Sequence, residues 1–284
     1  MTDHDPVDRQ PDMWARPAAQ RSDGNGQVFR FLLPVLVLAI VVGLWEAVVR
    51  FNGIPPYVLP GPFLVLSTLV QDWNLLFGSL LVTLLTTVEG FVAAAVGGIA
   101  LALLFSRSKW LEYSLFPYAV VLQVTPVIAV APLLLIYLPQ ELAVVACAWI
   151  VAFFPVLSNT TLGLKSVDRN LAGLFTLYGA SPLQTLQLLK LPSALPYILG
   201  GLRIAGGLSL IGAVVAEIAA GSAGAGSGLA YRIAESSYRL NIPRMFAALL
   251  LLSVAGIVIY MLLSLVSYLV LRRWHESALG KDIG

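Results

Sequence analysis

Six long apolar runs constrain this chain most, because each is long enough to cross a lipid bilayer as a helix. A helix needs about 20 predominantly apolar residues to span the hydrocarbon core. The runs are Phe29–Val49, Leu80–Phe105, Leu115–Leu138, Leu142–Leu164, Ala194–Ala220 and Met245–Leu271. Only 11% of the residues are charged, against about 25% in a typical soluble domain. We therefore predict an all-α integral membrane protein with six transmembrane helices.

The basic residues are distributed unequally between the two sides of these spans. Twelve of the 17 Lys and Arg residues lie on the side of the chain termini and four on the opposite side, while Arg203 falls within a span. By the positive-inside rule, both termini are predicted to be cytoplasmic. A cleaved signal peptide is the alternative, but the first run exceeds the usual ~7–15 residues and no Ala-x-Ala site follows it.

This topology divides the chain into three segments. Residues 1–28 are rich in Asp, Arg, Pro, Gly and Gln, so we expect a disordered cytoplasmic tail there. Residues 29–274 are expected to form the six-helix membrane domain, which includes a long cytoplasmic loop at 165–192. Residues 275–284 are expected to form a second cytoplasmic tail.

The chain lacks the residue patterns of metal-dependent or hydrolytic chemistry. Cys147 is the single cysteine, and His4 and His275 both lie in polar tails, so no pair has metal-ligand spacing. No Gly-x-x-x-x-Gly-Lys-Ser/Thr loop for ATP is present. The net charge of +2 gives no reason to expect nucleic acid. We expect no catalytic residue, no metal and no cofactor bound by this chain, which is predicted not to be an enzyme.

Two loops on the side opposite the termini have distinct patterns. After Gly61, Pro62 fits the first position of a helix, and apolar residues follow at helical spacing, which predicts a short interfacial helix. The segment Gly221–Gly228 is rich in glycine but lacks the ending of a phosphate-binding loop. A flexible or re-entrant loop is expected there.

The long loop at 165–192 contains signals for two short helices. Apolar residues recur at helical spacing until Gly179, which suits the left-handed turn that ends a helix. Ser181, Pro182 and Gln184 then form the pattern of a capping box at a second helix start. We expect Leu191-Pro192 to end this second helix. Periodicity alone leaves two readings open, a docking surface for a partner or an amphipathic pair lying on the lipid headgroups.

A resemblance decides between them. After Gly179 come nine residues and then Leu189-Lys190-Leu191-Pro192. This is similar to the loop motif of bacterial binding-protein-dependent permeases, Glu-Ala-Ala, three residues, Gly, nine residues, Ile, one residue, Leu-Pro. Gly173-Leu174-Phe175 replace the first three positions of that motif. The wider match, from about Pro60 to Trp274, resembles the sulfonate, nitrate and taurine branch, which also contains permeases for pyrimidine precursors and riboflavin.

The resemblance implies a type I ABC importer permease fold in a bacterial inner (plasma) membrane. Two permease copies, expected to form a homodimer, would line one path, and an extracytoplasmic solute-binding protein would deliver the solute. Two separate ATPase subunits would bind ATP and Mg and dock at the cytoplasmic loop. The residues expected to couple to the ATPase are Leu174, Phe175, Tyr178, Gly179, Ala180, Ser181, Leu183, Leu191 and Pro192. An ion-coupled secondary transporter is the alternative, although no convincing internal repeat supports it.

Ionisable residues within the spans indicate a translocation path, because a charge at the bilayer centre costs at least about 2.5–3.5 kcal/mol and must face protein or water. Glu46 lies four residues before Arg50, so an ion pair explains it. Glu217 is expected to belong to the outer gate or its support. The residues expected to line the path are Thr83, Thr87, Glu89 and Asn159. An interhelical hydrogen bond that only stabilises the assembly is the competing explanation for Glu89.

Overall fold

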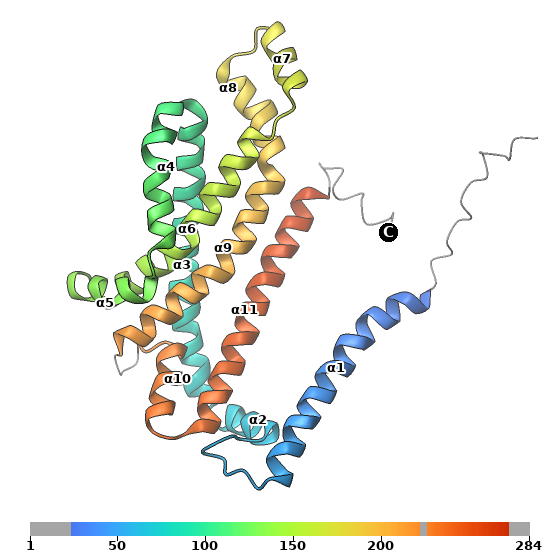
Figure 1. Cartoon of the computed structure of the whole chain (residues 1–284), viewed down its shortest axis with the longest axis vertical. Coiled ribbons are helices and arrows are strands. Elements are labelled where there is room, and N and C mark those ends of the chain that lie inside the picture. Colours follow the sequence, from blue (N-terminus) through green and yellow to red (C-terminus); the bar gives the residue numbers. More distant parts are fainter. Residues whose placement is uncertain (1–23, 222–225, 273–284) are drawn as a thin grey trace, which may run out of the picture. The chain divides into compact units, whose positions relative to one another are not determined.

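A computed structural model describes residues 24–221 and 226–272, with side chains described from residue 32 onward, and those residues form helices and connecting turns without any strand. The helices are α1 (Gly24–Phe51), α2 (Pro62–Gln71), α3 (Trp73–Arg107), α4 (Lys109–Val124), α5 (Val127–Tyr137), α6 (Gln140–Lys165), α7 (Arg169–Leu177), α8 (Pro182–Thr185), the π-helical turn η1 (Leu186–Lys190), α9 (Leu191–Ala220), α10 (Leu229–Tyr238) and α11 (Ile242–Leu271) (Figure 1). The chain divides into two units, residues 1–52 and 53–284. Of the predicted tails, residues 1–23 and 275–284 lie outside the described residues.

The first unit consists of one long apolar helix in its described part. Helix α1 begins at Gly24, so its first residues, 24–28, belong to the segment predicted as the N-terminal tail. Its apolar side chains are mostly exposed, as suits a helix surrounded by lipid. The predicted pair between Glu46 and Arg50, one helical turn apart, is confirmed as an ion pair.

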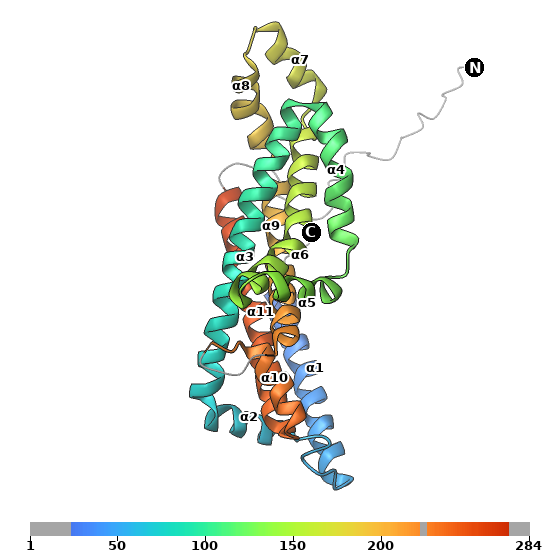
Figure 2. The same ribbon diagram turned by 90° about the vertical axis from the view of Figure 1, so that its left-hand side faces the viewer.

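The centre of the second unit is formed by α3, α6 and α9, which Figure 2 shows side by side. Small residues allow these helices to approach closely in lipid, where no hydrophobic drive between helices exists. A Cβ atom added to Gly90 of α3 would lie 2.5 Å from the Cβ of Ala148 in α6, and one added to Gly212 of α9 would lie 2.6 Å from the carbonyl oxygen of Cys147. The backbone contacts at these positions require glycine.

The third predicted span, Leu115–Leu138, is not one straight helix. Helices α4 and α5 meet at a bend of 99°. The cause lies at Thr125-Pro126, because the proline has no N–H to continue the helix and its ring disfavours helical backbone angles at the preceding residue. Thr125 accordingly has extended angles, φ −70° and ψ 122°. Among the described residues, five helices are long and apolar enough to cross a membrane, or up to six if the bent pair counts as one span.

The predicted helix end at Leu191-Pro192 is wrong. Helix α8 continues through η1 into α9, which gives an unbroken helical segment over Pro182–Ala220. The wide π-helical turn ends directly before Leu191, so Pro192 occupies the start of the next regular segment, where its missing N–H is tolerated. By contrast, the predicted start of α2 is confirmed, with Gly61 before the helix and Pro62 in its first turn.

Candidate transport and coupling sites

The second unit has two ends that carry different kinds of residue. We call them the α7 end, where α7, α8 and the C-terminus of α3 lie, and the α10 end, where α2 and α10 lie (Figure 1). The residues predicted to couple to an ATPase fall at the α7 end. Thr83 and Glu217 fall at the α10 end, next to the N-terminus of α10.

Helix α7 ends in the turn that Gly179 predicts. Gly179 has φ +67°, a left-handed conformation in which a side chain would be strained. Its N–H donates to the carbonyl oxygen of Thr176 at 3.0 Å, and the Ala180 N–H donates to that of Phe175 at 3.0 Å. These two bonds form a Schellman motif, which satisfies the last carbonyl groups of the helix.

Helix α8 begins with the predicted capping box. The Ser181 N–H donates to Oε1 of Gln184 at 2.7 Å, and the Gln184 N–H donates to Oγ of Ser181 at 3.2 Å. Two backbone N–H groups at the start of α8, which have no partner within the helix, are therefore hydrogen-bonded within the four residues from Ser181 to Gln184. The position and shape of this turn are determined locally.

Apolar side chains remain exposed on this ordered loop. Tyr178 is 83% exposed, Leu183 51% and Leu174 46%, while Phe175 is half-buried. Leu191 and Pro192 are half-buried where η1 joins α9, so they lie apart from this exposed group. The structure therefore places seven of the nine predicted coupling residues in and beside the two turns.

At the α10 end, α3 and α9 supply the polar groups that cap α10. Helix α10 follows Gly228, which has no side chain to cap it. Instead, the Leu229 N–H donates to Oγ1 of Thr83 at 2.8 Å, and the Ala230 N–H donates to Oε2 of Glu217 at 3.1 Å. The Thr83 hydroxyl donates to the same Glu217 oxygen at 2.9 Å. A carboxylate at a helix N-terminus also interacts favourably with the helix dipole.

This arrangement leaves no room for a side chain at Gly228. Glu217 is 4% exposed. A Cβ atom added to Gly228 would lie 2.1 Å from the Glu217 carboxyl carbon. The residue before α10 must therefore be glycine for the carboxylate to reach the first turn of the helix.

The other predicted path residues lie outside this network. The Thr87 hydroxyl donates to the Thr83 carbonyl oxygen at 2.6 Å, and the Thr87 carbonyl oxygen accepts from Oγ of Ser209 at 2.8 Å, which joins α3 to α9. Asn159 is half-buried and donates to the Pro155 carbonyl oxygen at 2.8 Å within α6. Glu89 is exposed on α3. Within residues 24–221 and 226–272, no hydrogen bond joins Glu89 or Asn159 to the Glu217 network.

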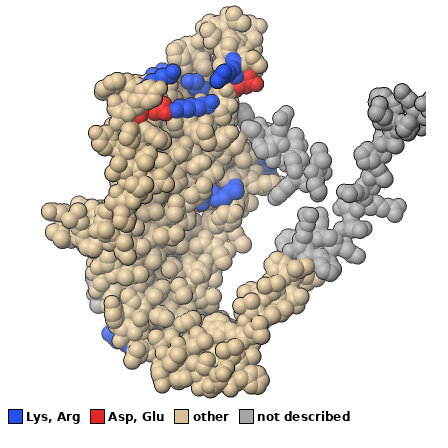
Figure 3. All heavy atoms as spheres, in the orientation of Figure 1, with Lys and Arg blue, Asp and Glu red and all other residues tan. Residues whose placement is uncertain are grey.

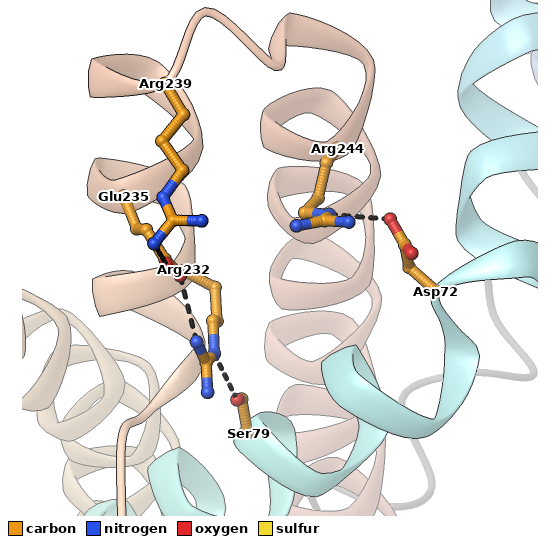
Figure 4. Close-up of polar contacts among 6 residues, drawn as sticks. All are labelled: Asp72, Ser79, Arg232, Glu235, Arg239 and Arg244. Atoms are coloured by element: carbon orange, nitrogen blue, oxygen red, sulfur yellow. Dashed lines mark hydrogen bonds and ion pairs between the residues drawn. The ribbon is translucent and has the colours of Figure 1, made fainter. Parts of the chain in front are cut away.

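Sequence reasoning missed the polar contacts that hold α10 and α11 in place. Nε of Arg244 in α11 lies 2.6 Å from Asp72, directly before α3. Arg232 of α10 pairs with Glu235 at 2.9 Å and donates to Ser79 of α3 at 3.1 Å (Figure 4). Arg239 also pairs with Glu235, at 2.9 Å. The helical spacing of Arg232, Glu235 and Arg239 was the available signal in the sequence.

The described residues contain no group of three or more His, Cys, Asp or Glu side chains that could hold a metal ion. The polar groups described at the two ends are hydrogen-bonded turns and helix caps.

Known proteins resemble this chain over most of its length. Residues 94–278 match the family described as binding-protein-dependent transport system inner membrane component. The riboflavin transport system permease protein RibX of Chloroflexus aurantiacus is 34% identical over 248 residues, covering 86% of this chain and 90% of that protein. The formylaminopyrimidine transport permease protein ThiX of Halalkalibacterium halodurans is 36% identical over 231 residues, covering 81% and 90%.

Two further comparisons extend this result. The nitrate import permease protein NrtB of Synechocystis is 28% identical over 245 residues, covering 81% of this chain and 86% of that protein. A solved structure of an amino acid ABC transporter with histidines has a TM-score of 0.58 at 22% identity, covering 70% of this chain and 96% of that one. The structural match shows a shared fold. The chain belongs to the family of binding-protein-dependent transport inner membrane components, whose members are the permeases of ABC transporters.

Proposed function

We propose that this chain is the transmembrane permease subunit of an ATP-driven importer in a bacterial inner membrane. The observation that carries the proposal is the ordered loop at the α7 end, whose Schellman turn and capping box present exposed apolar side chains away from the helical bundle. An apolar surface held on two locally fixed turns suits the docking of a rigid partner. We take that partner to be a separate ATPase, which binds ATP and Mg.

The α7 end is then cytoplasmic, as are both termini, and the α10 end faces outward. A solute-binding protein outside the membrane delivers the solute to the α10 end. The named relatives carry riboflavin, formylaminopyrimidine and nitrate. These names support a small organic solute or anion as the cargo.

A second permease copy completes the path in this proposal. Glu89 lies within a predicted membrane span and is exposed on the single chain. A carboxylate facing hydrocarbon is unfavourable by several kcal/mol, so Glu89 must face another protein surface or water. A homodimer that encloses a water-filled path would give Glu89 both a partner protein surface and water to face. Glu89 and the half-buried Asn159 are proposed to line that path, while the buried Thr83 and Thr87 hold α3 against α10 and α9 beside it.

Glu217 has a supporting role at the outer gate in this proposal. Its carboxylate holds the first turn of α10 against α3 and α9. A change in the spacing of α3 and α9 would therefore release or reposition α10. This provides a mechanical connection between the movement of the spans and the outer surface.

Reconstitution of the chain with its ATPase and binding protein tests the proposed function. Uptake into proteoliposomes should require all three components and ATP on the side of the α7 end. Uptake by the chain alone, driven by a proton or sodium gradient, would instead identify a secondary transporter.

A further inference from the structure

Two adjoining hollows at the α7 end are not explained by the proposed transport path. The larger has a volume of about 510 Å³ and lies between the end of α3 and the segment from Ala180 to Lys190. The smaller has a volume of about 160 Å³ and lies among the ends of α3, α4 and α6. Ser106 and Lys190 line both hollows, which makes the two spaces neighbours.

The charges around these hollows are mostly positive. Arg107 lines the larger hollow, Lys109 and Lys165 line the smaller, and Lys190 lines both. Glu112 is the acidic residue among the lining residues, and it forms an ion pair with Lys165. Figure 3 shows Lys and Arg gathered at this end of the bundle.

Three of these cations are not neutralised by neighbouring side chains. Arg107, Lys109 and Lys190 form no ion pair within residues 24–221 and 226–272. The positive-inside rule accounts for basic residues on this side of the membrane, but not for their convergence from α3, α4 and η1 on one space. Like charges repel one another, so their convergence favours a bound anion.

A buried hydroxyl group provides an independent sign of a ligand. Thr161 of α6 is 7% exposed and lines the smaller hollow. Its Oγ1 atom is buried without a hydrogen-bond partner among the described residues. Buried polar atoms are nearly always paired, so this hydroxyl leaves one hydrogen bond for a bound water or ligand to complete.

The surroundings indicate which anion fits. Lysine ammonium groups act as point charges that bind phosphate well. The smaller hollow also has apolar walls, formed by Ala102, Phe105 and Leu164. The site lies where the apolar spans end, which is the level of lipid headgroups, and basic pockets between transmembrane helices bind such groups. We propose that the two hollows form a binding site for the phosphate headgroup of an anionic phospholipid, held by Arg107, Lys109 and Lys190.

Binding at this site would also affect the loop above it. Lys190 belongs to η1, and Ala180, Pro182 and Thr185 line the larger hollow together with Arg107 of α3. An occupied site therefore links the end of α3 to the loop that carries the capping box. The regulation of ATPase docking by this link rests on the proposed function, whereas lipid binding itself does not.

Lipid retention by the purified full-length chain tests the proposal. Native mass spectrometry should show that phosphatidylglycerol is retained more strongly than phosphatidylcholine with the same acyl chains. Each neutralised cation should weaken retention of phosphatidylglycerol by about fivefold, since one basic residue near an anionic lipid contributes about 1 kcal/mol. The variants are Lys190→Gln and the double variant Lys109→Gln with Lys190→Gln.

Two control variants test whether a loss of lipid retention comes from the missing charge at the site, rather than from misfolding or from a lower overall charge. Lys190→Arg keeps the charge and should retain the lipid. Arg169→Gln removes an exposed charge from the start of α7, outside the lining of both hollows, and should leave retention unchanged. Equal retention of the two lipids, or equal losses in Arg169→Gln and Lys190→Gln, would overturn the proposal. Displacement of the lipid by millimolar inorganic phosphate would overturn the assignment to a lipid headgroup in favour of a free phosphate anion.

Discussion

The α7 end and the α10 end of the second unit are both built from short helices, but they are held in opposite ways. At the α7 end, the turns are closed by bonds between near neighbours in sequence, and the apolar side chains stay exposed. At the α10 end, Thr83 and Glu217 are 134 residues apart and are buried together. The difference indicates that the first end keeps its shape independently of the bundle, as a docking surface must, while the second depends on how the spans pack.

The largest stability effect is expected at the α10 end, from Glu217→Leu. Leucine fills a similar volume but accepts no hydrogen bond, so the Ala230 N–H loses its acceptor and the Thr83 hydroxyl keeps only the Ser79 carbonyl oxygen, at 3.3 Å. Each unsatisfied buried donor costs about 1–3 kcal/mol. Thermal unfolding of the purified protein in detergent should show a clear fall in Tm.

Glu217→Gln is the matched control for this experiment. Its amide oxygen still accepts both hydrogen bonds, so its Tm should stay close to that of the wild type. If Glu217→Leu were as stable as Glu217→Gln, the network would not hold α10 in place.

At the α7 end, Gly179→Val should affect coupling more than stability. Valine in a left-handed turn is strained by about 1–2 kcal/mol, which disrupts the Schellman turn. No atoms lie within 4 Å of a Cβ at Gly179, so the bundle itself is not disturbed. ATP hydrolysis stimulated by solute should fall while Tm changes little.

Gly173→Ala serves as the control, because Gly173 lies within α7 with open space around its Cβ position. This variant should retain stimulated hydrolysis. Normal coupling in Gly179→Val would show that the turn is not needed for docking.

These two ends also show what sequence reasoning is able to predict. The Schellman turn at Gly179 and the Ser181 capping box were predictable because all their partners lie within about five residues of chain. Helix α10 and its caps were not, because the Leu229 N–H finds its acceptor 146 residues away. A prediction from local pattern contains no information on such distant partners.

Proline positions were only partly informative, for a related reason. Pro126 interrupts the third predicted span, and α4 meets α5, which packs against α6 and α9, at a bend of 99° there. Leu191-Pro192 was expected to end a helix, yet η1 lets the helical segment continue into α9. In both cases the proline determines which backbone hydrogen bond is lost. It does not determine whether the helical segment bends sharply or continues.

The smallest effect on stability is expected from Glu89→Gln. Among the described residues, Glu89 is exposed and lies outside the hydrogen-bond network around Glu217, so its replacement should leave Tm and assembly unchanged. If Glu89 faces the path, solute uptake should nevertheless fall, because the amide removes the charge and keeps the shape. The measurement is uptake by proteoliposomes at matched protein content.

Glu141→Gln is a suitable control, since it removes another exposed carboxylate, from the first turn of α6. It should leave uptake unchanged. Full uptake in Glu89→Gln, or a loss explained by failed assembly, would remove Glu89 from the proposed path.

Site-directed cross-linking tests most directly the claim that the α7 end docks the ATPase. Single cysteines would replace Tyr178 and Leu183 at the α7 end, and Gln71, exposed on α2 at the α10 end, in a background in which the buried Cys147 is alanine. We expect cross-links to the ATPase subunit from both positions at the α7 end and none from Gln71. Cross-links from Gln71, or none from the α7 end in a complex that still hydrolyses ATP on addition of solute, would contradict this claim.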